Sequence, residues 1–234
     1  MIPLSYYENG YSSYEEFLGT NLETSKIISQ VNQRAVEDST FEQRQLGKQK
    51  LFNYVNDNLI IGGYDYFEFG VAHGGSFELW SKFNKINQLY GFDTFTGLPD
   101  KWHRCFTSDI NSKINWAISE KGEYSVNGNL PNVGYNTTLI AGLFQETLYP
   151  FMIKYTNKNK VIYIDSDLYS SALFILTTMH PYLKNNDIII FDELCDRLNE
   201  FKAFNDYIMS YYMKDKLRLE ACSYETFAFK VINK

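Results

Sequence analysis

Four carboxylates follow two apolar runs late in the chain, in positions where they could act together. Asp165 and Asp167 follow the run KVIYI, and Asp192 and Glu193 follow the run IIIF. If the two runs are neighbouring parallel strands, they lie about 4.8 Å apart and their carboxyl ends meet at one edge of the sheet. Crowded carboxylates repel one another unless a cation lies among them, and an all-oxygen site favours Mg²⁺, Mn²⁺ or Ca²⁺. The pattern therefore predicts a divalent metal site.

Asp165 and Asp167 stand two residues apart, a spacing that on a strand places both side chains on one side of the sheet. Metal coordination lowers the pKa of an alcohol, and a nearby carboxylate can then take its proton. A structural alternative stays open: Asp167 caps a helix that begins near Tyr169, and the later carboxylates lie apart in water.

A second group of residues indicates a nucleotide-like ligand. The run ending in EFGVAHGGS carries Gly70, Gly74 and Gly75, which allow a tight turn and a close backbone approach to a ligand. The next run ends in Asp93, a position from which an acid can accept hydrogen bonds from ribose hydroxyls. The turn is neither GxGxxG nor a phosphate-binding loop. Together, the turn and the acid predict an adenosine site; a purely structural turn is the alternative.

The remaining pattern predicts the scaffold. Short apolar runs alternate with helical patterns, which indicates an α/β fold with a doubly wound, mostly parallel sheet. The five expected parallel strands are residues 64–71, 88–95, 137–142, 160–167 and 187–194. Two further strands, within 217–225 and 226–233, are too close for a crossover and predict a C-terminal antiparallel hairpin, giving seven strands. Residues 99–131 lack periodicity and are expected to form a long binding loop or lid.

The motifs EFGVAHGGS, YGFDTFTGLPDKW, GLFQETLYPF, YIDSDLYSSA, IIIFDEL and NEFKAF occur in this order. With them the chain resembles the class I S-adenosylmethionine-dependent methyltransferases of the macrocin O-methyltransferase type, over about residues 50 to 233. The resemblance implies a Rossmann-like methyltransferase domain at 51–234. Residues 1–50 are then expected to be an N-terminal helical extension that serves as a lid or an oligomer contact.

The resemblance also implies roles for individual residues. The residues expected to bind S-adenosylmethionine are Glu68, Gly70, Gly74 and Ser76 near its methionine end, Asp93 at the ribose, and Gly142 and Leu143 near the adenine. The expected metal ligands, for Mg²⁺ above all, are Asp165, Asp192 and Glu193, and the expected general base is Asp167.

The function expected from these features is metal-assisted O-methylation of a hydroxyl on a sugar, sugar nucleotide or glycosylated small molecule. Two alternatives stay open: a metal-dependent catechol-like O-methyltransferase, and a non-catalytic nucleotide-binding protein of the same fold. Retention of Asp167 beside the carboxylates favours an enzyme, because binding alone needs no base.

Composition limits the partners. The 234 residues carry 22 Lys and Arg against 28 Asp and Glu, a net charge of −6 that suits nucleic acid poorly. No stretch approaches the roughly 18 apolar residues of a membrane span. The three cysteines are far apart, which indicates neither a disulfide framework nor a zinc site. We expect a cytoplasmic enzyme with a small-molecule substrate, and assembly into a homo-oligomer stays open.

Overall fold

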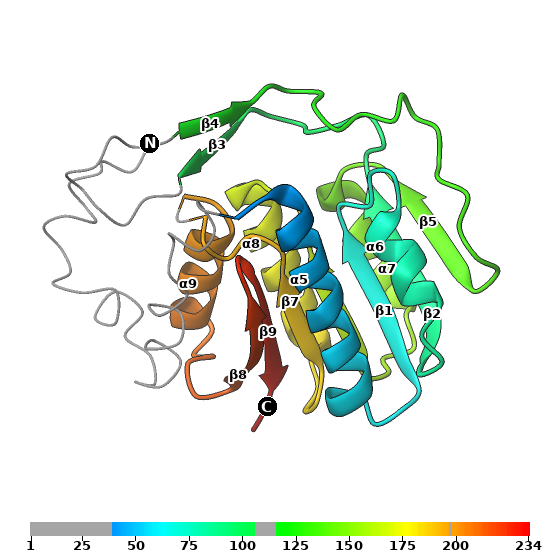
Figure 1. Cartoon of the computed structure of the whole chain (residues 1–234). Helices are drawn as coiled ribbons and strands as arrows, with labels where there is room; N and C mark the ends of the chain where they lie inside the picture. Colours follow the sequence, from blue (N-terminus) through cyan, green and yellow to red (C-terminus); the bar gives the residue numbers. More distant parts are fainter. Residues whose placement is uncertain (1–38, 106–115, 197) are drawn as a thin grey trace, which may run out of the picture.

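A seven-stranded sheet forms the centre of the molecule (Figure 1). The computed structural model describes residues 39–105, 116–196 and 198–234. The strands of the sheet, in its spatial order, are β5 (Thr137–Ala141), β2 (Ile86–Asp93), β1 (Tyr64–Phe69), β6 (Lys160–Ile164), β7 (Ile188–Phe191), β9 (Thr226–Val231) and β8 (Leu217–Ser223). The first five are parallel, and β9 pairs antiparallel with both β7 and β8. The predicted doubly wound sheet with its C-terminal hairpin is confirmed.

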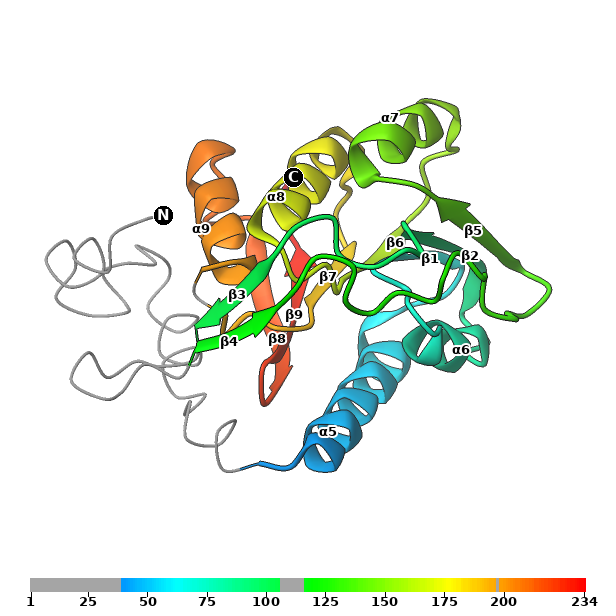
Figure 2. The same cartoon turned by 90° about the horizontal axis from the view of Figure 1, so that it is seen from above.

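Helices cover both faces of the sheet, and Figure 2 shows the three layers from above. One face carries α7 (Phe144–Lys154), α8 (Tyr169–Met179) and α9 (Glu200–Ser210), and the other carries α5 (Phe41–Tyr54) and α6 (Gly75–Ser81). Short helical turns follow α5 at Val55–Leu59 and α8 at His180–Tyr182. None of the helices in the described ranges is long and apolar enough to cross a membrane.

The two faces of the sheet are set by strict alternation along its central strands. Phe67 and Phe69 of β1 point into the core beneath α7, α8 and α9, whereas Tyr66 points into the core beneath α5 and α6. Tyr163 of β6 and Ile190 of β7 also belong to the core on the α5 side. Side chains alternate with a period of two along an extended strand. A residue two positions after Tyr163 or Ile190 therefore also lies on the α5 side, provided that the backbone stays extended.

Two features differ from the sequence-based expectation. Residues 99–131 include a two-stranded antiparallel pair, β3 (Trp102–Cys105) and β4 (Trp116–Ser119), where an irregular loop was expected. Each strand has only four residues, too few for alternation to stand out in the sequence. The expected boundary at residue 50 falls inside α5, which packs against the sheet through Leu51 and Phe52. Most of the expected extension, residues 1–38, lies outside the described residues.

A fully buried ion pair joins the amino-terminal end of β6 to the loop before β7. The ammonium of Lys160 lies 2.7 Å from Oδ2 of Asp187, and both side chains are 0% exposed. Removing one partner from such a pair leaves an uncompensated charge in the core.

We expect Lys160→Met to lower the free energy of unfolding by about 3 to 5 kcal/mol, measured by urea denaturation. Lys82→Met is the control, because its ion pair with Glu78 is exposed and its loss should leave the free energy of unfolding nearly unchanged. Equal effects of the two substitutions would contradict the importance of the buried pair.

Candidate active site

The register of the sheet aligns the residues that follow its central strands. Phe69 pairs with Ile164, and Ile164 pairs with Phe191. The amide of Asp165 donates to the carbonyl of Phe69 at 2.9 Å, and the amide of Asp192 donates to the carbonyl of Ile164 at 2.9 Å. Asp165 and Asp192 are therefore neighbours at the carboxyl edge of the sheet, as the sequence predicts.

This edge opens into a cavity of about 540 Å³, within the size range of small-molecule sites. It lies where the strand order reverses between β1 and β6, which is where open α/β sheets bind ligands. The predicted site residues that line it are Glu68, Gly70, Ser76, Asp93, Leu143, Asp165, Asp167, Asp192 and Glu193. Gly74 and Gly142 do not line it; they have positive φ angles of 82° and 138° and serve the turns before α6 and α7.

Asp93 ties the end of β2 to the glycine turn after β1. Its Oδ2 accepts hydrogen bonds from the amides of Val71 and Ala72, both at 2.8 Å, and its Oδ1 accepts from the amide of Phe95 at 2.7 Å. An ionised carboxylate offers about four acceptor positions. The hydroxyl of Thr94 makes a fourth, long contact of 3.5 Å to Oδ1. Asp93 therefore organises the turn, and only this long contact leaves room for a ligand hydroxyl.

Glu68 lies beneath the turn, on the α5 side of β1. It is buried, and the hydroxyl of Tyr66 donates to its Oε2 at 2.6 Å. Burial raises the pKa of Glu68 well above its ordinary value, and the hydrogen bond from Tyr66 opposes this shift. Because Glu68 lines the cavity, it can receive a polar or cationic group of a ligand from above.

Asp165 and Asp192 share the hydroxyl of Tyr163, which lies 3.0 Å from Oδ2 of Asp165 and 2.8 Å from Oδ1 of Asp192. Burial raises the pKa of Asp165, and the charge of Asp192 raises it further. The ammonium of Lys48, from α5, lies 2.7 Å from Oδ1 and 2.8 Å from Oδ2 of Asp192. A protein cation thus already compensates this pair.

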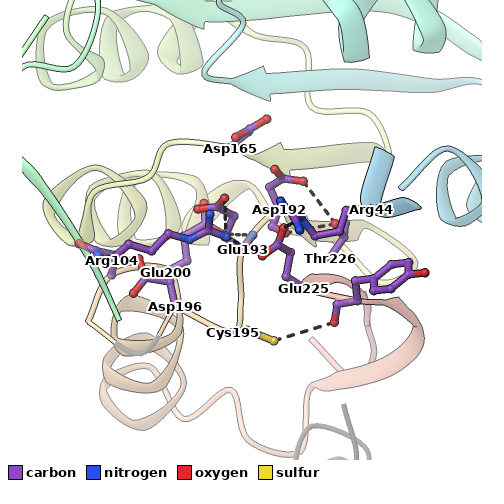
Figure 3. A network of polar contacts seen from close by, with 12 residues as sticks. Arg44, Arg104, Asp165, Asp192, Glu193, Cys195, Asp196, Glu200, Glu225 and Thr226 are labelled. Carbon is purple, nitrogen blue, oxygen red and sulfur yellow. Dashed lines mark hydrogen bonds and ion pairs between the residues drawn. The ribbon is translucent and has the colours of Figure 1, made fainter. Parts of the chain in front are cut away.

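Glu193 is paired in the same way, as Figure 3 shows. The guanidinium of Arg104, from β3, lies 2.8 Å from Oε1 of Glu193 and 2.5 Å from Oε2 of Glu225. Arg44 of α5 adds a contact to Glu225 at 3.2 Å. Glu193 therefore faces Arg104 rather than joining Asp165 and Asp192 around a common point.

The predicted metal ligands do not fit a divalent ion in this arrangement. Both oxygens of Asp192 contact Lys48, and one oxygen of Glu193 contacts Arg104. Over residues 39–105, 116–196 and 198–234, no three His, Cys, Asp or Glu side chains are placed to hold a metal ion. The sequence showed that the carboxylates gather, but Asp192 and Glu193 are each paired with a protein cation, Lys48 and Arg104.

Asp167 lines the cavity, but it does not lie on strand β6 with Asp165, as its spacing in the sequence predicts. Strand β6 ends at Ile164, and Asp167 has a left-handed backbone with φ 58°, so strand alternation does not extend to it. It does not cap α8 either, since the N-cap residue is Leu168 and the amide of Tyr169 donates instead to Oδ1 of Asn199 at 3.2 Å. Burial raises the pKa of Asp167, the charges of Asp165 and Asp192 raise it further, and Arg104 opposes them.

Sequence reasoning missed several residues of this site, chiefly Lys48, Arg104 and Tyr163. The hydroxyl of Tyr163 could have been anticipated, because Tyr163 stands two positions before Asp165 on the same strand. Lys48 and Arg104 reach the carboxylates from segments 144 and 89 residues away, and no local pattern marks them.

The family of the chain follows from a comparison with known proteins. Residues 67–194, more than half of the sequence, match the family model described as a methyltransferase domain. The chain belongs to this methyltransferase domain family. The matched span contains the glycine turn, Asp93 and the four carboxylates of the strand ends. The expected enzyme class, an S-adenosylmethionine-dependent methyltransferase, is confirmed by this match.

Solved structures of methyltransferases have the same fold. CalS11, described as a calicheamicin methyltransferase, is 20% identical and superposes with a TM-score of 0.57 over 97% of this chain and 89% of its own. An apo structure of CalS11, described as TDP-rhamnose 3′-O-methyltransferase, is 17% identical with a TM-score of 0.53, covering 94% and 96%. The O-methyltransferase NovP is 18% identical with a TM-score of 0.51, covering 82% and 78%. Comparison with curated proteins gave no significant match.

Within this methyltransferase domain, Gly70 allows the close approach of β1 to β6 at the floor of the cavity. Its φ is 96°, and a Cβ at this position would lie 1.7 Å from the carbonyl oxygen of Asp165. A side chain here would strain the backbone and push the two strand ends apart.

We expect Gly70→Ala to lower the free energy of unfolding by roughly 2 to 5 kcal/mol, from the positive φ and the overlap together. Gly75→Ala in the same turn is the matched control, because its Cβ meets nothing within 4 Å and its φ is not positive. In urea denaturation, Gly75→Ala should leave the free energy of unfolding unchanged or raise it slightly. A fully stable Gly70→Ala protein would show that the strand ends can separate freely.

Proposed function

We propose that this protein transfers the methyl group of S-adenosylmethionine to a hydroxyl of a sugar, sugar nucleotide or glycosylated small molecule, as the macrocin O-methyltransferase type does. The observation that carries the proposal is a single cavity that joins the glycine turn and Asp93 to Asp167. A donor held on the turn and an acceptor next to Asp167 would share this space. The division into an N-terminal extension and a methyltransferase domain at 51–234 belongs to the same proposal, with α5 crossing the boundary and packing on the sheet of that domain.

The residues at the turn suit the donor. Asp93 would accept a hydrogen bond from a ribose hydroxyl at Oδ1, in place of the long 3.5 Å contact from the hydroxyl of Thr94, while its three backbone contacts stay in place. Glu68 would receive the methionine end, and Leu143 and Ser76 would contact the rest of the molecule. When bound, S-adenosylmethionine supplies a methyl group on a positively charged sulfur.

Asp167 is suited to act as the general base. The attacking hydroxyl would form a bond to the methyl carbon while the carbon–sulfur bond breaks, and its proton would pass to the Asp167 carboxylate. Asp167 lines the cavity, and no hydrogen bond or ion pair within the described part of the chain engages its carboxylate. No step of this mechanism involves a metal ion, because Lys48 and Arg104 already pair with Asp192 and Glu193.

The acceptor end of the cavity favours a polyhydroxylated molecule. The cavity lining includes Arg44, Gln45, Arg104, Glu193 and Glu225, which can hydrogen-bond to hydroxyls, together with the aromatic side chains of Phe41, Trp102 and Tyr124. The likeness to CalS11, whose described acceptor is TDP-rhamnose, supports a sugar acceptor, since both chains share the fold. Methyl-transfer assays with sugar nucleotides, glycosides and catechols side by side test this choice, and turnover confined to catechols would contradict it.

We expect Asp93→Ala to weaken binding of S-adenosylhomocysteine by about 1.5 to 3 kcal/mol, through the loss of charge-assisted hydrogen bonds. Isothermal titration calorimetry measures this. Asp215→Ala, at an exposed position before β8, is the control and should bind as the wild type does. Wild-type protein that binds neither donor nor product would overturn the proposed function.

We expect Asp167→Asn to lower kcat by about 10²- to 10⁴-fold with donor binding unchanged, since an amide cannot accept the hydroxyl proton. Single-turnover methyl transfer and calorimetry on the same preparation separate the two effects. Normal turnover by Asp167→Asn would remove the base from the mechanism.

A further inference from the structure

Lys48 has the geometry of a built-in counterion. Its ammonium contacts both oxygens of Asp192, at 2.7 and 2.8 Å, and lies 5.9 Å from the centre of the Tyr163 ring. The side chains of Lys48 and Asp192 are only 13% and 10% exposed. An ion pair held out of water in this way is much stronger than one at the surface, and each partner depends on the other.

Helix α5 places Lys48 rigidly. One turn further along the helix, Phe52 is buried and packs edge-on against Tyr163, with ring centres 5.1 Å apart. On the other side of Lys48, Gly47 lies so close to β8 that a Cβ would be 2.4 Å from Oγ of Ser223. The helix is therefore docked tightly on both sides of the lysine, and its backbone keeps the ammonium within reach of Asp192.

The face of the sheet explains why this helix meets these carboxylates. Asp165 and Asp192 follow Tyr163 and Ile190 by two positions, and those two residues belong to the core beneath α5. The hydroxyl of Tyr163 has one hydrogen to give but stands within hydrogen-bonding distance of both aspartates. The pair thus needs a cation, and α5 supplies it from the side on which both carboxylates lie.

We propose that Lys48 takes the place of a divalent metal ion at this site, so that methyl transfer proceeds without a metal. This inference rests on the proposed function. Lys48 is a positioning residue: it acts through Asp192, holding that carboxylate in place and offsetting the negative charge that Asp165 and Asp192 bring to the acceptor end of the cavity. A divalent ion on Asp192 would have to displace the ammonium or lie beside a like charge.

A titration with Mn²⁺ tests the proposal without requiring turnover. Free Mn²⁺ is followed by electron paramagnetic resonance in the presence of S-adenosylhomocysteine. We expect wild-type protein to show no site at micromolar Mn²⁺, Lys48→Ala to bind Mn²⁺ at least about tenfold more tightly, and Lys48→Ala/Asp192→Asn to lose that site. Lys50→Ala, an exposed lysine on the same helix, is the matched control and should behave as wild type.

Activity gives the second measurement. Wild-type turnover should be the same in chelator and in Mg²⁺. Lys48→Ala should lose about 10- to 100-fold in kcat with the affinity for S-adenosylhomocysteine unchanged, whereas Lys48→Arg, which keeps the charge, should retain most of the rate. A purely structural role predicts that Lys48→Arg, which is larger, fails as badly as Lys48→Ala.

Three results would overturn the proposal: micromolar Mn²⁺ binding by wild-type protein that Asp192→Asn abolishes, wild-type activity that disappears in chelator and returns with Mg²⁺, or a Lys48→Ala protein that gains no Mn²⁺ affinity. If Lys48→Ala does not fold, the wild-type titration and Lys48→Arg still decide the question. Failure of the proposed function is seen separately, as wild-type protein that does not bind S-adenosylhomocysteine while the Mn²⁺ results stand.

Discussion

The alternation of side chains on three adjacent parallel strands is the constraint on which the site depends. β1, β6 and β7 are buried on both faces, so each strand has one register in which its large side chains fit. With that register fixed, the backbone at Asp165 and Asp192 continues the ladder by one hydrogen bond, and their carboxylates lie on the α5 side. Shifting either strand by one residue would turn its carboxylate toward the opposite helices. The strand register that packs the core is therefore also the register that places the carboxylates of the site.

This placement has an electrostatic cost that other parts of the chain offset. Several carboxylates lie near one another with little access to water, and burial alone raises the pKa of Asp165, Asp167 and Glu193. Lys48 and Arg104 are cations brought to them from two different elements, α5 and β3. An uncompensated buried charge costs several kcal/mol, so the folding of these elements and the ionisation of the carboxylates are linked.

The sequence is informative wherever the signal is local. Runs of apolar residues locate the strands, and the ends of those runs place Gly70, Asp93, Asp165 and Asp192 at one edge of the sheet. The sequence is misleading at Asp167, because the apolar run suggests a continuing strand where a left-handed residue instead turns the chain. No local pattern in the sequence marks Lys48, because its partner Asp192 lies 144 residues away in the chain. The charges of a site can thus be predicted as a group, but the partner of each charge depends on tertiary packing that no short pattern records.

The residues that complete this site lie partly outside the part of the chain that identifies the family. The matched region, 67–194, contains Asp165, Asp192 and Glu193, whereas Lys48 and Arg44 precede it and Glu225 follows it. A metal ion would bind such carboxylates from solution, at a strength set by its concentration. A lysine on a docked helix is instead always present at the site once the chain has folded, and it cannot be removed by a chelator. The fold itself thus supplies the cation of the site. The close packing of Gly47 and Phe52 holds α5 against the sheet, and in doing so it keeps the ammonium of Lys48 next to Asp192.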